Sequence, residues 1–186
     1  MASRRAPRDD DEAQGIRPLR TEELFLAHGA TIWRALRRLG VMEVDVDDVC
    51  QEVFLIVHQR LHTFEGRSSA LTWIYGICVR VASDYRKRLH GASQRSAECA
   101  VEPRMEGRQE EAFAIREARA KLDRILDTLD SDKRSVFVLF EIEEMAMADV
   151  AIALGCPLQT AYSRLHAARR EVDAAIARLS DVEAFR

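Results

Sequence analysis

The chain has 186 residues, enough for one ordinary domain or for two small ones. Apolar residues make up 47% and charged residues 32%, which is the composition of a folded globular protein and excludes a disordered chain. The formal net charge is −3, so the chain lacks the basic excess that an autonomous DNA-binding protein usually carries. Any contact with nucleic acid must come from local basic faces, or must depend on a partner that holds the chain on DNA.

The low content of glycine and proline, 8 and 4 residues, favours long helices over a sheet of many strands. No apolar run is long enough to cross a bilayer, and the basic N-terminal segment is not followed by the apolar stretch of a secretory signal. These features predict a cytoplasmic protein without membrane insertion. The four cysteines are far apart and form no CxxC pair, so we expect buried or free thiols and no metal site.

Composition divides the chain into two small all-helical domains joined by a flexible linker. The predicted order is a disordered tail (1–18), a first domain (19–89), a linker (90–112), a second domain (113–180) and a short tail (181–186). Helical spacing of apolar residues predicts helices over 20–39, 46–62 and 70–89 in the first domain. In the second domain it predicts a helix leading to Leu129, then helices over 132–142, 147–154 and 158–179.

The span 147–170 has the pattern of a helix-turn-helix. A short apolar segment is followed by Gly155-Cys156-Pro157 and then by a longer helix. Glycine can adopt the positive φ that ends the first helix, and proline can enter the second but cannot continue the first. In the second helix Leu158, Ala161, Leu165 and Ala168 are expected to point inward. Residues 155–170 contain three arginines and no acid, so the outward face suits a DNA major groove.

Two further segments have unusual charge patterns. Residues 43–52 carry five acids and no base, which fits either a solvated helix face or a surface that binds a protein partner. Residues 71–88 combine Trp73, Tyr75 and Tyr85 with four cations, a combination that suits single-stranded or melted DNA. Trp73 is also compatible with a place in the core, and the basic run at the end is compatible with a helix C-terminus.

Three motifs resemble the small two-domain, extracytoplasmic-function (ECF) sigma factors of the sigma-70 family. They are Asp48-x-x-Gln51-Glu52-x-Phe54, the Phe64-x-Gly66 loop with Thr72-Trp73, and Ser163-Arg164-Leu165-His166-x-Ala168-Arg169. They occur in the order expected for a region 2 helical bundle and a region 4 helix-turn-helix. The resemblance implies a subunit that is not an enzyme, needs no cofactor, binds core RNA polymerase and promoter DNA, and is restrained by an anti-sigma factor.

The resemblance also implies roles for individual residues, in three sets. The set that binds core polymerase, on the clamp of its large subunit, is Asp48, Gln51, Glu52 and Phe54. The set for the −10 element is Phe64, Gly66, Ser68, Ser69, Thr72, Trp73, Arg80, Asp84, Tyr85, Arg86, Lys87 and Arg88. The set for the −35 element is Gln159, Thr160, Ser163, Arg164, His166, Arg169 and Arg170. The second domain is also expected to contact the polymerase flap.

The sequence departs from the family pattern at several positions. Arginine is common where this chain has Gly76, asparagine where it has Arg80, and glycine where it has Glu144. The pair before Thr-Trp is usually bulky or basic but here is Ala70-Leu71; Ala146 and Tyr162 replace a usual serine and lysine. These changes put the preferred promoter sequence in question, and they leave the expected docking to polymerase intact.

Three other functions compete with this one. An autonomous helix-turn-helix regulator would bind duplex DNA tightly without polymerase. An enzyme is disfavoured, because the chain has no P-loop, nucleophile elbow, metal-ligand cluster or dinucleotide fingerprint. A helical adaptor that binds only proteins would tolerate loss of Arg164 and Arg169. The overall acidity favours the sigma factor, and it predicts weak binding of the isolated chain to promoter duplex.

Overall fold

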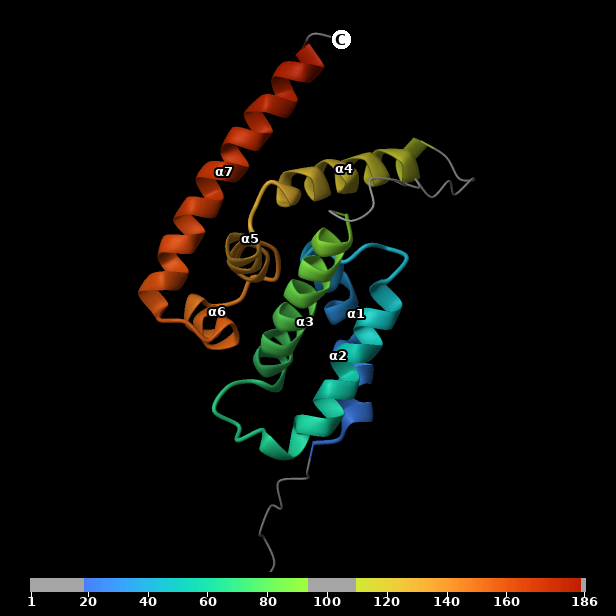
Figure 1. The fold of residues 1–186 in the computed structure, drawn as a ribbon, viewed down its shortest axis with the longest axis vertical. Coiled ribbons are helices and arrows are strands. Elements are labelled where there is room, and N and C mark those ends of the chain that lie inside the picture. Colours follow the sequence, from blue (N-terminus) through green and yellow to red (C-terminus); the bar gives the residue numbers. More distant parts are fainter. Residues whose placement is uncertain (1–18, 94–109, 185–186) are drawn as a thin grey trace, which may run out of the picture.

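The computed structural model describes residues 19–93 and 110–184, and within these ranges the secondary structure is helical throughout (Figure 1). The predicted all-α class is confirmed. The elements are α1 (Thr21–Arg38), α2 (Val46–Arg60), the short 3-10 helix η1 (Leu61–Thr63), α3 (Ala70–Ser93), α4 (Glu110–Asp127), α5 (Ser131–Phe137), the π-helical turn η2 (Val138–Ile142), α6 (Met147–Leu154) and α7 (Leu158–Ala184).

The N-terminal half is a bundle in which α1, α2 and α3 pack on one another. Each helix contributes a buried apolar stripe, as the helical spacing predicts. Ile32 and Leu36 of α1, Val53 of α2 and Ile74 of α3 are fully inaccessible to solvent. This core fixes the directions of the outward faces of α2 and α3, of which the first carries acidic and the second basic side chains.

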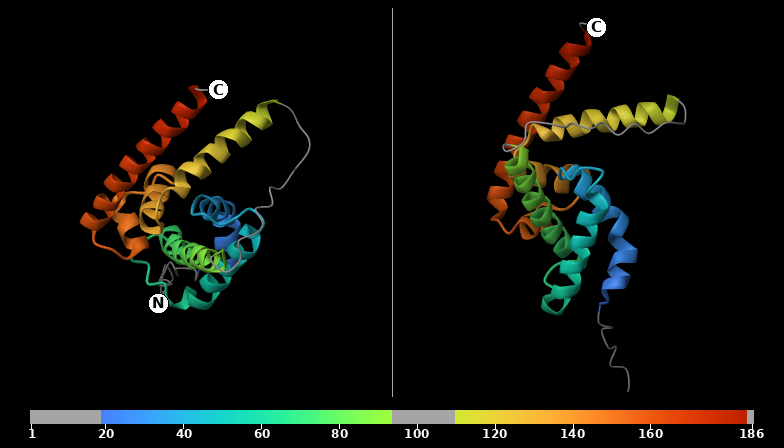
Figure 2. Two further views of the ribbon diagram at one scale, coloured as in Figure 1. Left: turned by 45° about the horizontal axis from the view of Figure 1, so that its top comes forward. Right: turned by 45° about the vertical axis from the view of Figure 1, so that its right-hand side comes forward.

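The C-terminal half is built on α5, α6 and α7, and α4 runs away from α5 and lies above α3 in the view of Figure 1. Asp130 caps α5 by accepting a 2.9 Å hydrogen bond from the backbone N–H of Lys133. Gly155 ends α6 with φ 62°, in the left-handed region expected for a glycine at this turn. The far end of α7 extends away from the helical bundle in both views of Figure 2.

The helix predicted over 132–142 is not a regular α-helix. It is α-helical only to Phe137 and then widens into the π-helical turn η2. Glu144 follows with φ 55°, a backbone conformation that costs a residue with a Cβ more than it costs glycine. This is the position where the family usually has glycine, so the backbone keeps the conformation that glycine favours although the residue has changed.

Helical structure extends into both ends of the segment assigned to a linker, because α3 ends at Ser93 and α4 begins at Glu110. The predicted tail over 1–18 and the middle of the linker, 94–109, lie outside the described residues. The division of the chain into the predicted domains therefore stays a prediction at its boundaries. No helix in the described ranges has both the length and the hydropathy needed to cross a membrane.

The two halves share one continuous buried core. Ile74 and Cys78 of α3 belong to the same cluster of buried side chains as Val136 of α5 and Val150 of α6. Side chains on α1 and α3 also make polar contacts with the C-terminal half, which are described below. The outward faces of α3 and α7 remain accessible although the two halves share this core.

Three of the four cysteines lie in the described ranges, and all three are free thiols: Cys50, Cys78 and Cys156. Cys50 and Cys78 are buried, and burial raises the pKa of both thiols. Since the thiolate is the reactive form, we expect iodoacetamide at pH 8 to modify partly exposed Cys156 in the native protein and to leave Cys50 and Cys78 unmodified until the protein is unfolded in urea. Peptide mapping by mass spectrometry measures this, and rapid native labelling of Cys78 would contradict it.

Candidate protein and nucleic-acid interfaces

The acidic segment forms the exposed side of α2. Asp47, Asp48 and Gln51 are exposed, and the indole N–H of Trp33 on α1 donates a 2.7 Å hydrogen bond to Asp47. Glu52 is half-buried and lies 3.8 Å from the guanidinium of Arg88 on α3. Three of the four residues expected to bind polymerase therefore reach solvent on one face of α2.

Phe54, the fourth residue of that set, is only 6% exposed. Its ring packs edge-on against Phe25 of α1 with the ring centroids 5.0 Å apart. Phe54 therefore cannot offer a large contact area to a partner from this position. Its place in the structure is to support the exposed Phe25.

A groove of about 1050 Å³ runs between α1 and α2. Its walls are mainly apolar, and Leu26 and Leu55 stand out because 83% and 57% of their surfaces are exposed. Glu22, Asp47 and Asp48 also line it, so an apolar floor is bordered by negative charge. Neither leucine belongs to a residue set predicted from the sequence. The signal that could have identified them is an apolar residue on the outward side of each of two helices.

The loop that precedes α3 is shaped by its own polar contacts. Ser69 caps α3, because its hydroxyl accepts a 3.0 Å hydrogen bond from the backbone N–H of Thr72 and lies 2.8 Å from the Thr72 hydroxyl. Thr72 is buried, so its side chain is not available to DNA in this conformation. Gly66 has φ 68°, which allows the loop to turn, and the Phe64 ring lies against Trp73 with centroids 5.4 Å apart.

The basic end of α3 faces in two directions. Arg80, Lys87 and Arg88 are exposed, and Lys87 lies 3.3 Å from the Asp84 carboxylate. Tyr85 points inward and donates a 2.5 Å hydrogen bond to Asp45; burial and this bond raise the pKa of Tyr85 to about 12.

Arg86 also turns away from the exposed face, toward the C-terminal half. It donates a 3.3 Å hydrogen bond to the Leu129 carbonyl, and burial and the nearby Arg134 lower its pKa. The basic run 86–88 is thus divided in the structure, because Lys87 and Arg88 are exposed whereas Arg86 makes an inward contact.

The second helix of the helix-turn-helix presents a polar face to solvent. Ala161, Leu165 and Ala168 are buried, as predicted, whereas Leu158 is 47% exposed, so its predicted inward position is wrong. Leu158 is the first residue of α7, and the turn before it leaves its side chain beyond the edge of the core. The exposed side chains on the outward face are Gln159, Tyr162, Ser163, His166, Arg169 and Arg170.

Two arginines of this helix are held by acids from α5 and η2. Arg164 lies 2.5 Å from Asp132, and Arg169 donates a 2.7 Å hydrogen bond to Glu141 while lying 5.8 Å from the centre of the Phe140 ring. These contacts direct both guanidinium groups toward the neighbouring helices. Arg170 is exposed, so it is better placed than Arg164 or Arg169 for a first contact with DNA.

The described residues hold no group of three or more His, Cys, Asp or Glu side chains that could bind a metal ion. Within those residues, the arrangement offers two kinds of surface. One is the apolar groove between α1 and α2 with its acidic border. The other consists of the exposed cations and aromatic rings on α3 and on α7, which can meet phosphates and bases.

Comparison with known proteins identifies the class. Residues 24–91 match the family model for sigma-70 region 2, and residues 119–172 match that for sigma-70 region 4. The chain therefore belongs to the sigma-70 family, with the two regions in the order predicted from the sequence. The helical bundle is region 2, and the part that contains the helix-turn-helix is region 4.

Similar proteins narrow the class to the ECF sigma factors. The ECF RNA polymerase sigma-E factor of Escherichia coli strain K12 is 28% identical over 138 residues, which cover 69% of this chain and 72% of that protein. The RNA polymerase sigma factor NccH of Alcaligenes xylosoxydans xylosoxydans is 29% identical over 179 residues, 92% of this chain and 91% of that protein. The chain is thus an ECF-type sigma factor, a subunit that directs RNA polymerase to promoters.

Two solved structures share the fold. CnrH in complex with the cytosolic domain of CnrY is 26% identical, with a TM-score of 0.64 over 85% of this chain and 88% of that one. The sigma factor RpoE in complex with the anti-sigma factor NepR, from Bartonella quintana, is 17% identical, with a TM-score of 0.65 over 84% of this chain and 96% of that one. These likenesses favour an initiation factor over an autonomous helix-turn-helix regulator.

Proposed function

We propose that the groove between α1 and α2 is the surface that binds core RNA polymerase, on the clamp of its large subunit. The observation that carries this assignment is the pair of highly exposed leucines, Leu26 and Leu55, beside the acids of α2. Apolar side chains that are this exposed are stabilised when a partner covers them. The acidic border then selects a partner whose own contact surface is apolar with basic residues around it.

The DNA contacts are assigned to exposed cations of α3, to two half-buried aromatic rings near its start, and to the exposed face of α7. Arg80, Lys87 and Arg88 on α3, together with Phe64 and Trp73 at its start, are proposed to contact the −10 element. Their combination of cations with two aromatic rings in contact suits unpaired bases. The exposed face of α7 is proposed to enter the major groove at the −35 element, with Gln159, His166 and Arg170 as the first residues to meet base edges or phosphates.

Further partners are proposed from the family and from the fold. Region 4 is expected to contact the polymerase flap. An anti-sigma factor is expected to restrain the chain, since RpoE of Bartonella quintana, which shares the fold, forms a complex with the anti-sigma factor NepR. The chain is proposed to act in the cytoplasm as a non-catalytic subunit. It supplies promoter recognition, and the polymerase supplies the chemistry.

The proposed docking surface is tested by reversing its charge. We expect the Asp48→Lys/Glu52→Lys variant to lose recovery of core polymerase in a pull-down and to lose promoter-dependent initiation in a reconstituted transcription assay. The reason is that both lysines would repel the basic residues that are expected to surround the partner's contact surface. The variant Glu117→Lys/Asp173→Lys changes the net charge equally on exposed positions of α4 and α7, and it should still recover core polymerase.

If the charge-reversed α2 variant recovered polymerase as well as the wild type, the assignment of the groove would be wrong. The same preparations separate the alternative function. An autonomous regulator would bind a promoter duplex with nanomolar affinity in the absence of polymerase at physiological salt, whereas a sigma factor with net charge −3 should not.

A further inference from the structure

The second helix of the helix-turn-helix, α7, exposes two large apolar side chains at its start. Leu158 is 47% exposed and Tyr162 is 41% exposed. They are four residues apart, so their side chains project from the same side of the helix. Neither belongs to the buried stripe of α7, which is formed by Ala161, Leu165 and Ala168. Packing within the chain therefore does not account for these two side chains.

The exposed face around this pair is neutral at the start of the helix. From 158 to 166 the exposed residues include no Lys, Arg, Asp or Glu, and they are Leu158, Gln159, Tyr162, Ser163 and His166. The Ser163 hydroxyl donates a 3.0 Å hydrogen bond to the Gln159 carbonyl, so its single donor is already used within the helix. The exposed cations Arg169 and Arg170 follow only further along the helix.

The arginine nearest to the start of α7 is directed away from this face. Asp132 of α5 holds Arg164, and Glu141 of η2 holds Arg169 in the same way further along. A guanidinium that is bonded to a carboxylate has fewer donors left for a base. It also brings a negative charge toward the DNA, which carries negative charge itself. The residues left to meet base edges at the start of α7 are therefore the neutral ones.

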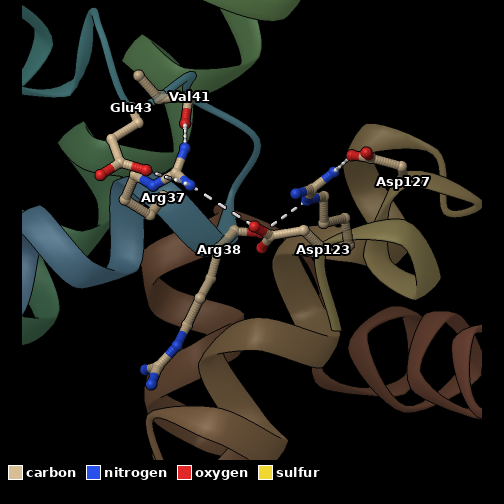
Figure 3. Close-up of polar contacts among 7 residues, drawn as sticks. Arg37, Arg38, Val41, Glu43, Asp123 and Asp127 are labelled. Atoms are coloured by element: carbon tan, nitrogen blue, oxygen red, sulfur yellow. Dashed lines mark hydrogen bonds and ion pairs between the residues drawn. The ribbon is translucent and has the colours of Figure 1, made fainter. Parts of the chain in front are cut away.

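Pairing of arginine with carboxylates is not confined to α7. Arg37 of α1 lies 3.5 Å from Glu43 and 3.6 Å from Asp123 of α4 (Figure 3). Arg134 of α5 lies 2.6 Å from Asp127. The chain has 31 acidic residues against 28 Lys and Arg, so carboxylates are available to take up much of its positive charge. A neutral reading face on α7 fits such a chain.

The chemistry of the base edges decides which base suits this face. In the major groove thymine presents a C5 methyl group, and apolar side chains contact it. Guanine presents two acceptors there, and these suit Arg or Lys. The N-terminal residues of the second helix in a helix-turn-helix are the ones that contact base edges. Leu158 and Tyr162 lie at that end of α7, so they are placed to contact thymine rather than guanine.

We propose that Leu158 and Tyr162 determine the specificity for the −35 element, and that they select A·T pairs by packing against thymine methyl groups. The proposal rests on the proposed function of α7. Gln159, next to Leu158, supplies an amide that can pair with an adenine of the same step. Arg170, further along the exposed face, contacts phosphate and adds affinity without base preference.

The first step of the test identifies the element. Holoenzyme is assembled from the full-length chain and core polymerase, and transcripts are selected from a promoter library that is randomised across the −35 and −10 elements. Wild type should enrich A·T pairs at adjacent positions of the −35 element. The Leu158→Ala/Tyr162→Ala variant should lose the enrichment at those positions and keep the enrichment at the −10 element.

Ile176→Ala is the matched control for this selection. Ile176 lies on the same helix beyond the reading face, and at 46% it is exposed nearly as much as Leu158. The control should select the same element as the wild type. Circular dichroism should show that the control and the double variant keep the helical content of the wild type.

Two substitutions at Tyr162 separate its ring from its hydroxyl and from a merely structural role. Tyr162→Phe keeps the ring, so it should keep the preference for thymine. Tyr162→Arg should move the preference at one position toward guanine, because arginine pairs with the two acceptors of that base. Selection of the wild-type element by Tyr162→Arg would contradict the placement of Tyr162 against a base.

Removal of a thymine methyl group then measures the contact directly. Uracil in place of thymine deletes the C5 methyl group and keeps the base pairing. Burial of one group of this size corresponds to a roughly fourfold change in affinity. We expect uracil at a contacted position to weaken promoter binding by wild-type holoenzyme by about this factor, and to leave binding by the double variant unchanged. Fluorescence anisotropy with labelled promoter fragments measures both.

The outcomes separate this proposal from the function on which it rests. Equal binding of thymine and uracil promoters by the wild type would overturn the role of Leu158 and Tyr162 and leave the sigma factor function standing. Selection of the same −35 element by wild type and double variant would overturn it too. The absence of transcripts from every member of the library would contradict the proposed function itself, and the −35 specificity with it.

Discussion

Replacing Leu26 and Leu55 with aspartate is expected to abolish the binding of core RNA polymerase while leaving the fold intact. Each leucine is worth roughly 1.5–3 kcal/mol when a partner buries it fully, so losing both weakens binding by about 100-fold or more. The new carboxylates would add to this loss, because they lie beside Asp47 and Asp48 and would have to be desolvated. Titration of labelled core polymerase with the variant measures the effect.

Met42→Asp/Val44→Asp is the matched control. Both residues are exposed apolar side chains between α1 and α2, and neither lines the groove. This control should bind polymerase within a few-fold of the wild type. Both double variants should melt near the wild-type temperature, since substitutions at exposed positions usually change stability by about 0.5 kcal/mol or less. Wild-type affinity in the Leu26→Asp/Leu55→Asp variant would remove the groove from the docking surface.

Arg134→Ala is expected to lower the free energy of unfolding by about 2–4 kcal/mol. The substitution empties the space of a side chain that is 2% exposed and removes the hydrogen bond to the Arg38 carbonyl. Arg134→Met fills most of that space without a charge to desolvate, so its loss should be smaller, about 1–2 kcal/mol. Urea denaturation followed by circular dichroism measures both values.

Arg124→Ala serves as the control for this pair, because Arg124 is an exposed arginine on neighbouring α4. It should change the stability by less than about 0.5 kcal/mol. Equal and small losses for Arg134→Ala and Arg124→Ala would show that the buried guanidinium contributes nothing to the packing between the regions. A reduced slope of unfolding in Arg134→Ala would instead indicate that the two regions no longer unfold together.

The sequence predicted the helix-turn-helix well because its signals are local. Gly155 ends α6 with a positive φ, and the inward positions of Ala161, Leu165 and Ala168 follow from helical spacing alone. The family resemblance depends on these short segments too, and the family models confirm it for both regions.

The parts that escaped prediction depend on which helix covers which face. Tyr85 and Arg86 belong to a segment whose sequence predicts a basic surface. In the structure Tyr85 instead points inward to Asp45, and Arg86 points inward to the Leu129 carbonyl, both of which are distant in the sequence. Phe54 matches a motif associated with docking, but its side chain is buried beneath Phe25. Periodicity within one helix predicts which residues point inward. It does not predict whether a neighbouring helix covers the residues at the edge of that inward stripe.

The close packing of α6 on α3 depends on Gly76, a residue that a single mutation can replace. Glycine codons become arginine, alanine or valine codons through the change of a single base, and each of these residues carries the Cβ that the carbonyl of Ala153 would meet. One mutational step can therefore change how α6 packs on α3, while the groove between α1 and α2 and the exposed side chains of α7 stay unaltered.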